Sequence, residues 1–331
     1  MTILPLVAGF VAVFSGAVLF TNAVEWAGQR LGLGVGAIGT LIAGVSTALP
    51  ESIIPVVAIA RDDPGSDGVA IGAILGAPFM LATIAMALVG VTAVAFRGRR
   101  LHGRRLDVHR ETLKRDLVFF LALLTAALIL GLGTPMVVRI PAAVALVLAY
   151  VVYAVLTVRR GGRTLSEDEL PALIGDPSKH DPPATWMVAI QFLAGLVLIV
   201  GGAHFVVDGL IELAELLGVS TLVLALIVAP LATELPEKAN SFLWVRDGKD
   251  SLALGNITGA LVFQSAIPVA LGVALTPWQL DGFAMLAAIL ALCGGAVAIW
   301  SLHVRNRFSS PAIVGWTLLF SVFVASVWVA G

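Results

Sequence analysis

Long apolar stretches separated by short polar segments form the dominant pattern of this chain. A helix needs about 20 mostly apolar residues to cross the hydrocarbon core of a bilayer. Ten stretches meet this requirement, so we expect ten transmembrane helices. Their approximate ranges are 4–28, 34–60, 69–96, 114–133, 137–158, 186–213, 219–245, 251–276, 280–302 and 312–330.

Composition agrees with this pattern. The chain has 331 residues, of which 59% are hydrophobic and only 12% are charged, and its mean hydropathy is +1.01. A soluble protein of this length would need far more polar surface. The sequence therefore predicts an all-α polytopic membrane protein in the lipid bilayer of the cell membrane (a plasma or inner membrane).

The basic residues are distributed unevenly between the two sides of the predicted membrane. All of the 20 Lys and Arg except Arg61, Arg139 and Lys238 lie in the loops that follow the odd-numbered spans. Cytoplasmic loops carry such an excess, so these loops are predicted to be cytoplasmic and both termini extracytoplasmic. Topology and contact with anionic lipids explain the basic run 97–115, and we expect no nucleic-acid partner.

An internal repeat divides the chain. With a shift of 186 residues, the segment 15–51 aligns without gaps over 201–237. Thr47-Ala-Leu-Pro-Glu51 then lies opposite Thr233-Glu-Leu-Pro-Glu237. With a shift of 183, Gly72-x-x-x-Gly76 lies opposite Gly255-x-x-x-Gly259.

These matches predict two five-helix halves. They are residues 1–158, with a repeat at about 34–96, and residues 186–331, with a repeat at about 219–276, joined by a cytoplasmic linker, 159–185. Span two runs outward and span seven inward, so the halves are inverted copies, an architecture of secondary transporters. Such symmetry brings Glu51 and Glu237 together near the middle of the membrane.

The repeated motif contains the chemistry of a hard-cation site. A carboxylate at membrane depth costs roughly 3 kcal/mol on insertion scales, which marks it as a functional candidate. Proline removes a backbone donor, so Pro50 and Pro236 should make helices 2 and 7 discontinuous and free a carbonyl in each. Thr47 and Thr233 precede the glutamates by four residues and share their helix faces. Oxygen ligands with two negative charges suit Ca²⁺ better than Mg²⁺ or softer metals.

The paired motifs, with Gly72-x-x-x-Gly76 and Gly255-Asn256-Ile-Thr-Gly259, resemble the two alpha repeats of the sodium/calcium exchanger family in the calcium/cation antiporter superfamily. This resemblance covers both halves in order. It implies alternating-access exchange of Ca²⁺ for Na⁺ or H⁺. Glu51 and Glu237 would be the central ligands, with oxygen from Thr47 and Thr233.

The chain departs from the family pattern at positions that supply sodium ligands. The family usually has Ser after the motif Thr and a Gly-Ser-Asn-x-x-Asn/Asp motif in the next span. The Ser hydroxyls and the acidic or amide position are changed, which argues against the full sodium complement of the family. The substituted positions are Ala48, Glu234, Ala77, Ala260, Leu81 and Gln264.

Glu234 and Lys238 are four residues apart, with the acid first, which favours a helical ion pair. If they pair, Glu51 and Glu237 leave the site with two net negative charges. We therefore hypothesise electroneutral exchange of one divalent cation for two protons or two Na⁺. Glu234 could instead be a ligand, and Asn256 could bind the ion or the broken helix. The full candidate metal-ligand set is Glu51, Glu237, Thr47, Thr233, Glu234, Gln264 and Asn256.

Other functions are less compatible with these residues. A monovalent Na⁺ or K⁺ exchanger against H⁺ on the same fold remains the alternative. An intramembrane hydrolase would need a nucleophile and a base in register, and His204 has no matching Ser motif, so we expect no enzyme activity. Cys293 is the only cysteine, and we expect no cofactor beyond the transported inorganic cations. The sequence leaves the oligomeric state open, and a monomer is compatible with it.

Overall fold

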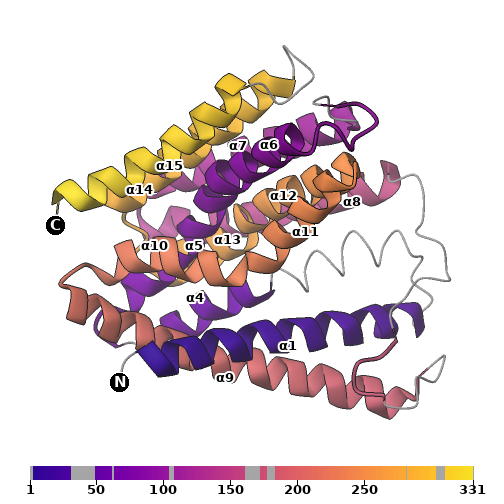
Figure 1. Cartoon of the computed structure of the whole chain (residues 1–331). Coiled ribbons are helices and arrows are strands. Elements are labelled where there is room, and N and C mark those ends of the chain that lie inside the picture. Colours follow the sequence, from indigo (N-terminus) through magenta and orange to yellow (C-terminus); the bar gives the residue numbers. More distant parts are fainter. Residues whose placement is uncertain are drawn as a thin grey trace.

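The computed structural model describes residues 3–30, 49–61, 63–103, 108–160, 172–176, 183–280, 282–302 and 310–330. Within these ranges every regular element is a helix and no strand occurs (Figure 1). The helices are α1 (Ile3–Arg30), α4 (Leu49–Arg61), α5 (Ser66–Met80), the π-helix η2 (Leu81–Ala85), α6 (Met86–Ala95), α7 (Arg110–Leu130), α8 (Met136–Arg160), α9 (Thr185–Leu217), α10 (Thr221–Thr233), α11 (Leu235–Arg246), α12 (Asp250–Gln264), α13 (Ile267–Leu275), α14 (Gly282–Trp300) and α15 (Ser310–Ala330).

Among the described residues, seven helical stretches are long and apolar enough to cross a membrane. Each coincides with a predicted span. Of the other three predicted spans, 34–60 begins outside the described residues and continues as α4. The span 114–133 is α7, whose first two turns are highly charged, and 219–245 is divided between α10 and α11. The all-helical membrane class is confirmed, and the count of ten stays a prediction.

Burial separates interior helices from helices that face lipid. Leu75 and Phe79 of α5 are fully buried, as are Leu254 and Ile257 of α12. In contrast, α8 and α15 expose large apolar side chains along their length, for example Trp328, which is 86% exposed. Such continuous apolar surface is unfavourable in water and is expected where a helix contacts lipid.

Helices α1 and α9 lie side by side along one edge of the assembly, opposite the edge formed by α14 and α15 (Figure 1). Gly9 faces Gly202 and Gly16 faces Gly195, so the two helices run antiparallel. A Cβ built on Gly16 would lie 2.8 Å from the Gly195 carbonyl oxygen. Small residues permit this close backbone approach, as they commonly do between transmembrane helices.

Helices α5 and α10 pack as closely, but in parallel. Gly72 faces Leu222 and Ala225, and Gly76 faces Leu226 and Pro230 further along α10. A Cβ on Gly72 would lie 2.6 Å from the Leu222 carbonyl oxygen. The first Gly-x-x-x-Gly pair therefore brings span three against the broken span seven.

For the second Gly-x-x-x-Gly pair, no helix of the described residues approaches as closely. No described residue lies within 4 Å of a Cβ built on Gly255 or Gly259 of α12. By the internal symmetry their partner would be the first part of span two, 34–48, which lies outside the described residues.

Three interruptions divide the interior helices. The predicted break in span seven is confirmed at Glu234, with Pro236 at the start of α11. Sequence analysis did not predict the π-helix η2 after α5 or the break at Ser265–Ala266 between α12 and α13. With the shift of 183, Ser265 lies opposite Ala82, inside η2. The position of the predicted break in span two, upstream of Leu49, falls outside the described residues.

Candidate cation site

The break between α10 and α11 positions Glu237. Pro236 cannot continue the hydrogen-bond ladder of α10, so a new helix begins beside it, and Glu237 falls in the first turn of α11. The positive end of the helix dipole favours a negative charge there. Glu237 is 7% exposed, and its Oε2 atom has no hydrogen-bond partner.

Glu51 of α4 reaches the same region from the other half. It is 5% exposed, and its Oε2 atom also lacks a partner. Its carboxylate interacts electrostatically with Glu237 and, less strongly, with Glu234. The structure thus places the two matched glutamates, 186 residues apart in the sequence, close enough to interact in the interior.

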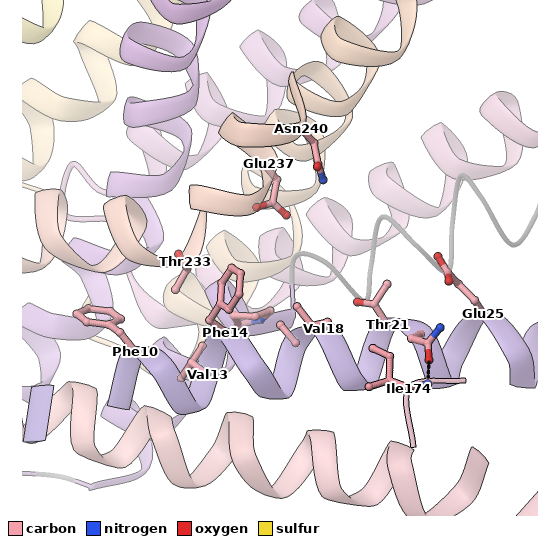
Figure 2. Close-up of a pocket in the computed structure, with 13 residues that line it drawn as sticks. Phe10, Val13, Phe14, Val18, Thr21, Glu25, Ile174, Thr233, Glu237 and Asn240 are labelled. Carbon is pink, nitrogen blue, oxygen red and sulfur yellow. Dashed lines mark hydrogen bonds between the residues drawn. The ribbon is translucent and has the colours of Figure 1, made fainter. Parts of the chain in front are cut away.

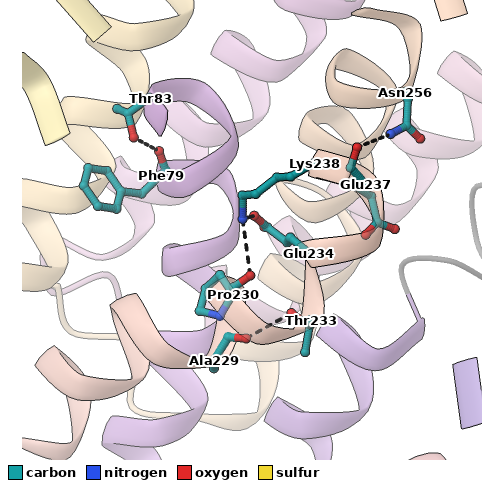
Figure 3. A network of polar contacts seen from close by, with 9 residues as sticks. All are labelled: Phe79, Thr83, Ala229, Pro230, Thr233, Glu234, Glu237, Lys238 and Asn256. Atoms are coloured by element: carbon teal, nitrogen blue, oxygen red, sulfur yellow. Dashed lines mark hydrogen bonds and ion pairs between the residues drawn. The ribbon is translucent and has the colours of Figure 1, made fainter. Parts of the chain in front are cut away.

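Thr233 lies beside the Glu51 carboxylate. Its hydroxyl donates a 3.1 Å hydrogen bond to the Ala229 carbonyl oxygen (Figure 3). The same hydroxyl lies within hydrogen-bonding distance of Glu51. With its proton directed to Ala229, the hydroxyl oxygen keeps lone pairs for a cation. Its counterpart Thr47 lies outside the described residues, as does Ala48.

The predicted ion pair between Glu234 and Lys238 is present, with 2.7 Å between Glu234 Oε2 and Lys238 Nζ. The same ammonium donates a longer, 3.4 Å hydrogen bond to the Pro230 carbonyl oxygen. Figure 3 shows this pair on one side of the helix break and the Glu237 carboxylate on the other. Gln264, at the end of α12, hydrogen bonds with Glu234, and its Oε1 atom has no partner.

Asn256 contacts the main chain of the broken helix. Its Nδ2 atom lies 3.5 Å from the Glu237 carbonyl oxygen and 3.4 Å from Ser241 Oγ. These contacts attach α12 to α11, the bonding role considered for Asn256 from the sequence. Sequence reasoning missed Ser265, whose buried Oγ has no partner and which follows Gln264 at the unpredicted helix break.

A cavity of about 300 Å³ reaches Glu237 (Figure 2). One wall consists of apolar side chains of α1, among them Phe10, Phe14 and Val18. Thr233, Glu237 and Asn240 line the opposite wall. The cavity also includes Asn22, whose Oδ1 atom accepts hydrogen bonds from Gln191 and from the backbone of Ile174.

The ligand atoms of the described residues limit which cation the site could bind. Among the residues that the structure describes, no group of three or more His, Cys, Asp or Glu side chains has a metal-binding arrangement. The acidic oxygens at this place belong to Glu51, Glu237 and Glu234, and hydroxyl, amide and carbonyl oxygens lie near them. Such an oxygen set suits a hard cation such as Ca²⁺ or Na⁺ and does not suit a metal that prefers nitrogen or sulfur.

The helical assembly, its lipid-facing apolar helices and its buried acidic residues define a polytopic membrane protein with an interior polar site. The family model described as sodium/calcium exchanger protein matches residues 1–159 and 187–329. The chain therefore belongs to the sodium/calcium exchanger family.

Two relatives extend over most of the chain. A putative antiporter, CaxA, of Alkalimonas amylolytica is 28% identical over 326 residues, which cover 95% of this chain and 97% of the relative. The inner membrane protein YrbG of Escherichia coli (strain K12) is 27% identical, with 75% of this chain and 71% of the relative covered.

Two solved structures share the fold. The crystal structure of the H⁺/Ca²⁺ exchanger CAX superposes with a TM-score of 0.77 at 20% identity, covering 98% of this chain and 82% of that one. A structure of the sodium-calcium exchanger NCX_Mj gives a TM-score of 0.61 at 18% identity, covering 98% and 99%. At these identities the likeness concerns the fold alone.

Proposed function

We propose that the protein is a secondary active antiporter that exchanges Ca²⁺, or a similar divalent cation, for Na⁺ or H⁺ by alternating access. The transported cation would bind between Glu51 and Glu237. One observation carries this proposal: both carboxylates are buried, they interact with each other, and each keeps an oxygen without a partner. Two uncompensated carboxylates in a protein interior are costly, and a bound divalent cation offsets that cost.

The proposed architecture has ten transmembrane helices in two inverted halves, 1–158 and 186–331, with the linker 159–185 in the cytoplasm. The helix directions support the division into five-span halves. With five spans in each half, span one is antiparallel to span six and span three is parallel to span seven, whichever side of the membrane the N-terminus lies on. The glycine contacts of α1 with α9 and of α5 with α10 have these directions. Both termini would be extracytoplasmic and the membrane would be the plasma or inner membrane.

The residues of the proposed site have different roles, which follow from what each side chain contacts. Glu51 and Glu237 supply charge, and Thr233, with Thr47 from the other half, supplies hydroxyl or carbonyl oxygen. Gln264 contributes to the surroundings through Glu234. The names of relatives support the cation class, because an H⁺/Ca²⁺ exchanger and a sodium-calcium exchanger share the fold.

Charge counting favours electroneutral exchange. Glu234 and Lys238 compensate each other at 2.7 Å, so two negative charges remain at the site. One divalent cation, two Na⁺ or two protons would each neutralise them. Since protons compete for the same carboxylates, the affinity for Ca²⁺ should fall as the pH is lowered.

A monovalent exchanger, Na⁺ or K⁺ against H⁺, is the second candidate. The same two buried carboxylates favour it, since each could be neutralised by one Na⁺, K⁺ or proton.

Transport by the purified full-length protein in proteoliposomes tests the proposal. Vesicles loaded with Na⁺, or with acidic buffer, should take up ⁴⁵Ca²⁺ against its gradient. On a solid-supported membrane the Ca²⁺-driven exchange should produce little charge movement. Gradient-driven Na⁺ flux that is insensitive to Ca²⁺ would favour the monovalent alternative, and a large Ca²⁺-driven current would contradict the electroneutral mode.

A further inference from the structure

Lys238 has surroundings that differ from those of an ordinary membrane lysine. Long basic side chains in membrane helices usually extend to the interface, whereas Lys238 is 8% exposed in the interior. Within the described residues its ammonium donates to two oxygen atoms, Glu234 Oε2 at 2.7 Å and the Pro230 carbonyl oxygen at 3.4 Å. A carboxylate and a backbone carbonyl are also the ligands that bind an alkali cation.

More oxygen is available at the same place than one ammonium uses. Glu234 is fully buried, and its second oxygen, Oε1, has no partner. The Oε1 atom of Gln264, whose side chain hydrogen bonds with Glu234, is also buried and without a partner. Oxygen atoms that could bind a cation therefore surround Lys238, next to the Glu51 and Glu237 carboxylates, and the ammonium contacts only some of them.

The internal repeat shows that this arrangement belongs to one half only. With the shift of 186, Glu234 lies opposite Ala48 and Lys238 opposite Ser52. The first half thus builds the same motif with neither the acid nor the base. An ion pair buried in one repeat and absent from the other is not a requirement of the repeated fold.

We infer that the Lys238 ammonium is a tethered cation that fills a monovalent-cation subsite formed by Glu234, Gln264 and the Pro230 carbonyl. This inference rests on the proposed cation exchange. It assigns Lys238 a role in setting how many ions the site accepts: the ammonium takes the place of one Na⁺ and leaves two negative charges for transported ions. A purely structural ion pair would stabilise the fold without changing the ion count.

Substitution of Lys238 separates these two roles. In Lys238→Met the buried Glu234 carboxylate loses its only cation, which is strongly unfavourable unless another cation replaces it. The variant should bind about one additional Na⁺ per protein, and the Na⁺ dependence of Ca²⁺ release should steepen by about one power. Its melting temperature should rise with Na⁺ concentration more than that of the wild type, because Na⁺ binds only the folded state.

Two further variants complete the test. Glu234→Gln combined with Lys238→Met removes both charges, so it should bind Na⁺ in the wild-type number and melt with wild-type Na⁺ dependence. Lys238→Gln is the second neutral variant, and its amide can still donate to Glu234. The readouts are equilibrium binding of ²²Na⁺ and thermal unfolding of the full-length protein in nanodiscs, at alkaline pH so that protons do not compete.

The outcomes separate this inference from the proposed function. Wild-type protein that binds neither Ca²⁺ nor Na⁺ would contradict the proposed function, and the inference with it. If the wild type binds both ions but Lys238→Met and Lys238→Gln bind no extra Na⁺, the tethered-cation inference is wrong and the exchanger proposal stands. The inference is also wrong if neither single variant folds in high Na⁺ while the double variant does.

Discussion

The two halves of the protein carry the same Thr-x-Leu-Pro-Glu motif in different surroundings. In the second half, Glu237 opens a new helix, and Glu234 and Lys238 form an ion pair beside it. In the first half, Glu51 has Ser52 as its neighbour, and Ala48 occupies the position of Glu234. One half therefore brings a single carboxylate and the other brings a carboxylate together with an internally neutralised pair.

This difference separates two kinds of buried acid. All three acids keep an oxygen without a partner, but Glu234 forms an ion pair with Lys238, whereas Glu51 and Glu237 interact electrostatically with each other and form no ion pair within the described residues. Because only uncompensated charge requires an exogenous cation, the asymmetry favours Glu51 and Glu237 over Glu234 as the proposed ligands of the transported ion. The symmetry of the fold alone does not make this distinction.

The largest effect on transport should come from removing the charge of an unpaired carboxylate, and removal of the paired one is the comparison. Glu51→Gln removes half of the negative charge of the site, and we expect ⁴⁵Ca²⁺ exchange in proteoliposomes to fall by about 100-fold or more, as for loss of one partner of a buried charged contact. Glu234→Gln with Lys238→Met keeps the net charge and should retain exchange within about threefold. Glu212→Gln, on the exposed face of α9, is the control. If both variants lose ⁴⁵Ca²⁺ exchange equally, Glu51 and Glu234 do not differ in their importance for transport, and the proposed distinction is wrong.

A smaller effect, on stability alone, is expected at an ion pair that connects the two halves. Arg100, after α6, and Asp250, at the start of α12, form a buried ion pair with 2.5 Å between Nη2 and Oδ2. Arg100→Met should destabilise the protein by about 3–5 kcal/mol, because it leaves the Asp250 charge buried. Chemical unfolding of purified protein measures this.

The matched control for that substitution is an exposed ion pair. Arg246→Met breaks the Arg246–Asp247 pair, and it should not change the unfolding midpoint. Arg100→Met combined with Asp250→Leu should recover most of the lost stability. If the single and double variants are equally unstable, the charge of Asp250 is not the cause.

The two Gly-x-x-x-Gly pairs provide a third comparison between the halves. Gly72→Ala places a methyl group against the Leu222 backbone and should cost about 1–3 kcal/mol through overpacking of α5 against α10. Gly255→Ala meets no described residue, so its effect on the melting temperature depends on the segment 34–48, which lies outside the described residues. A large loss for Gly255→Ala would indicate that the residues before Leu49 pack against α12 as closely as α10 packs against α5.

The smallest effect should come from the threonine beside the two carboxylates. Thr233→Val removes the hydroxyl and keeps the shape of the side chain, so Ca²⁺ affinity should fall by about 1 kcal/mol, roughly fivefold. Thr233→Ser keeps the hydroxyl and should retain the wild-type affinity. Titration of both variants with Ca²⁺ checks this, and equal affinities for Val and Ser would exclude the hydroxyl as a ligand.

Much of the fold could be predicted because the membrane restricts the options. Helices must satisfy their own backbone in lipid, so apolar stretches mark their positions, and Pro236 marks a break because it lacks a donor. The pairing of Glu234 with Lys238 follows from helical spacing and opposite charge. These are local properties, and the structure agrees with them.

Most of the features that escaped prediction depend on contacts between distant segments. Nothing local in Leu81–Ala85 indicates a π-helix. The break at Ser265–Ala266 does have a local signal, because Pro268 is the second residue of α13, as Pro236 is of α11. The bond from Thr258 Oγ1 to Asp116 Oδ2 joins α12 to α7 across 142 residues. Contacts of this kind depend on how the helices assemble, which a single sequence does not specify. The ligand roles of Glu51, Glu237, Thr233, Glu234, Gln264 and Asn256 stay predictions, as does that of Thr47 outside the described residues.

The central claim is that Glu51 and Glu237, one from each half, jointly bind a single divalent cation. Isothermal titration of the purified full-length protein with Ca²⁺ tests it most directly, with Mn²⁺, Mg²⁺ and Na⁺ as comparison ions. We predict about one Ca²⁺ per wild-type protein and no measurable Ca²⁺ binding to either Glu51→Gln or Glu237→Gln, since each leaves only half of the charge. Wild-type Ca²⁺ affinity in either variant would contradict the claim, as would the absence of cation binding by the wild type at every pH between about 6 and 9.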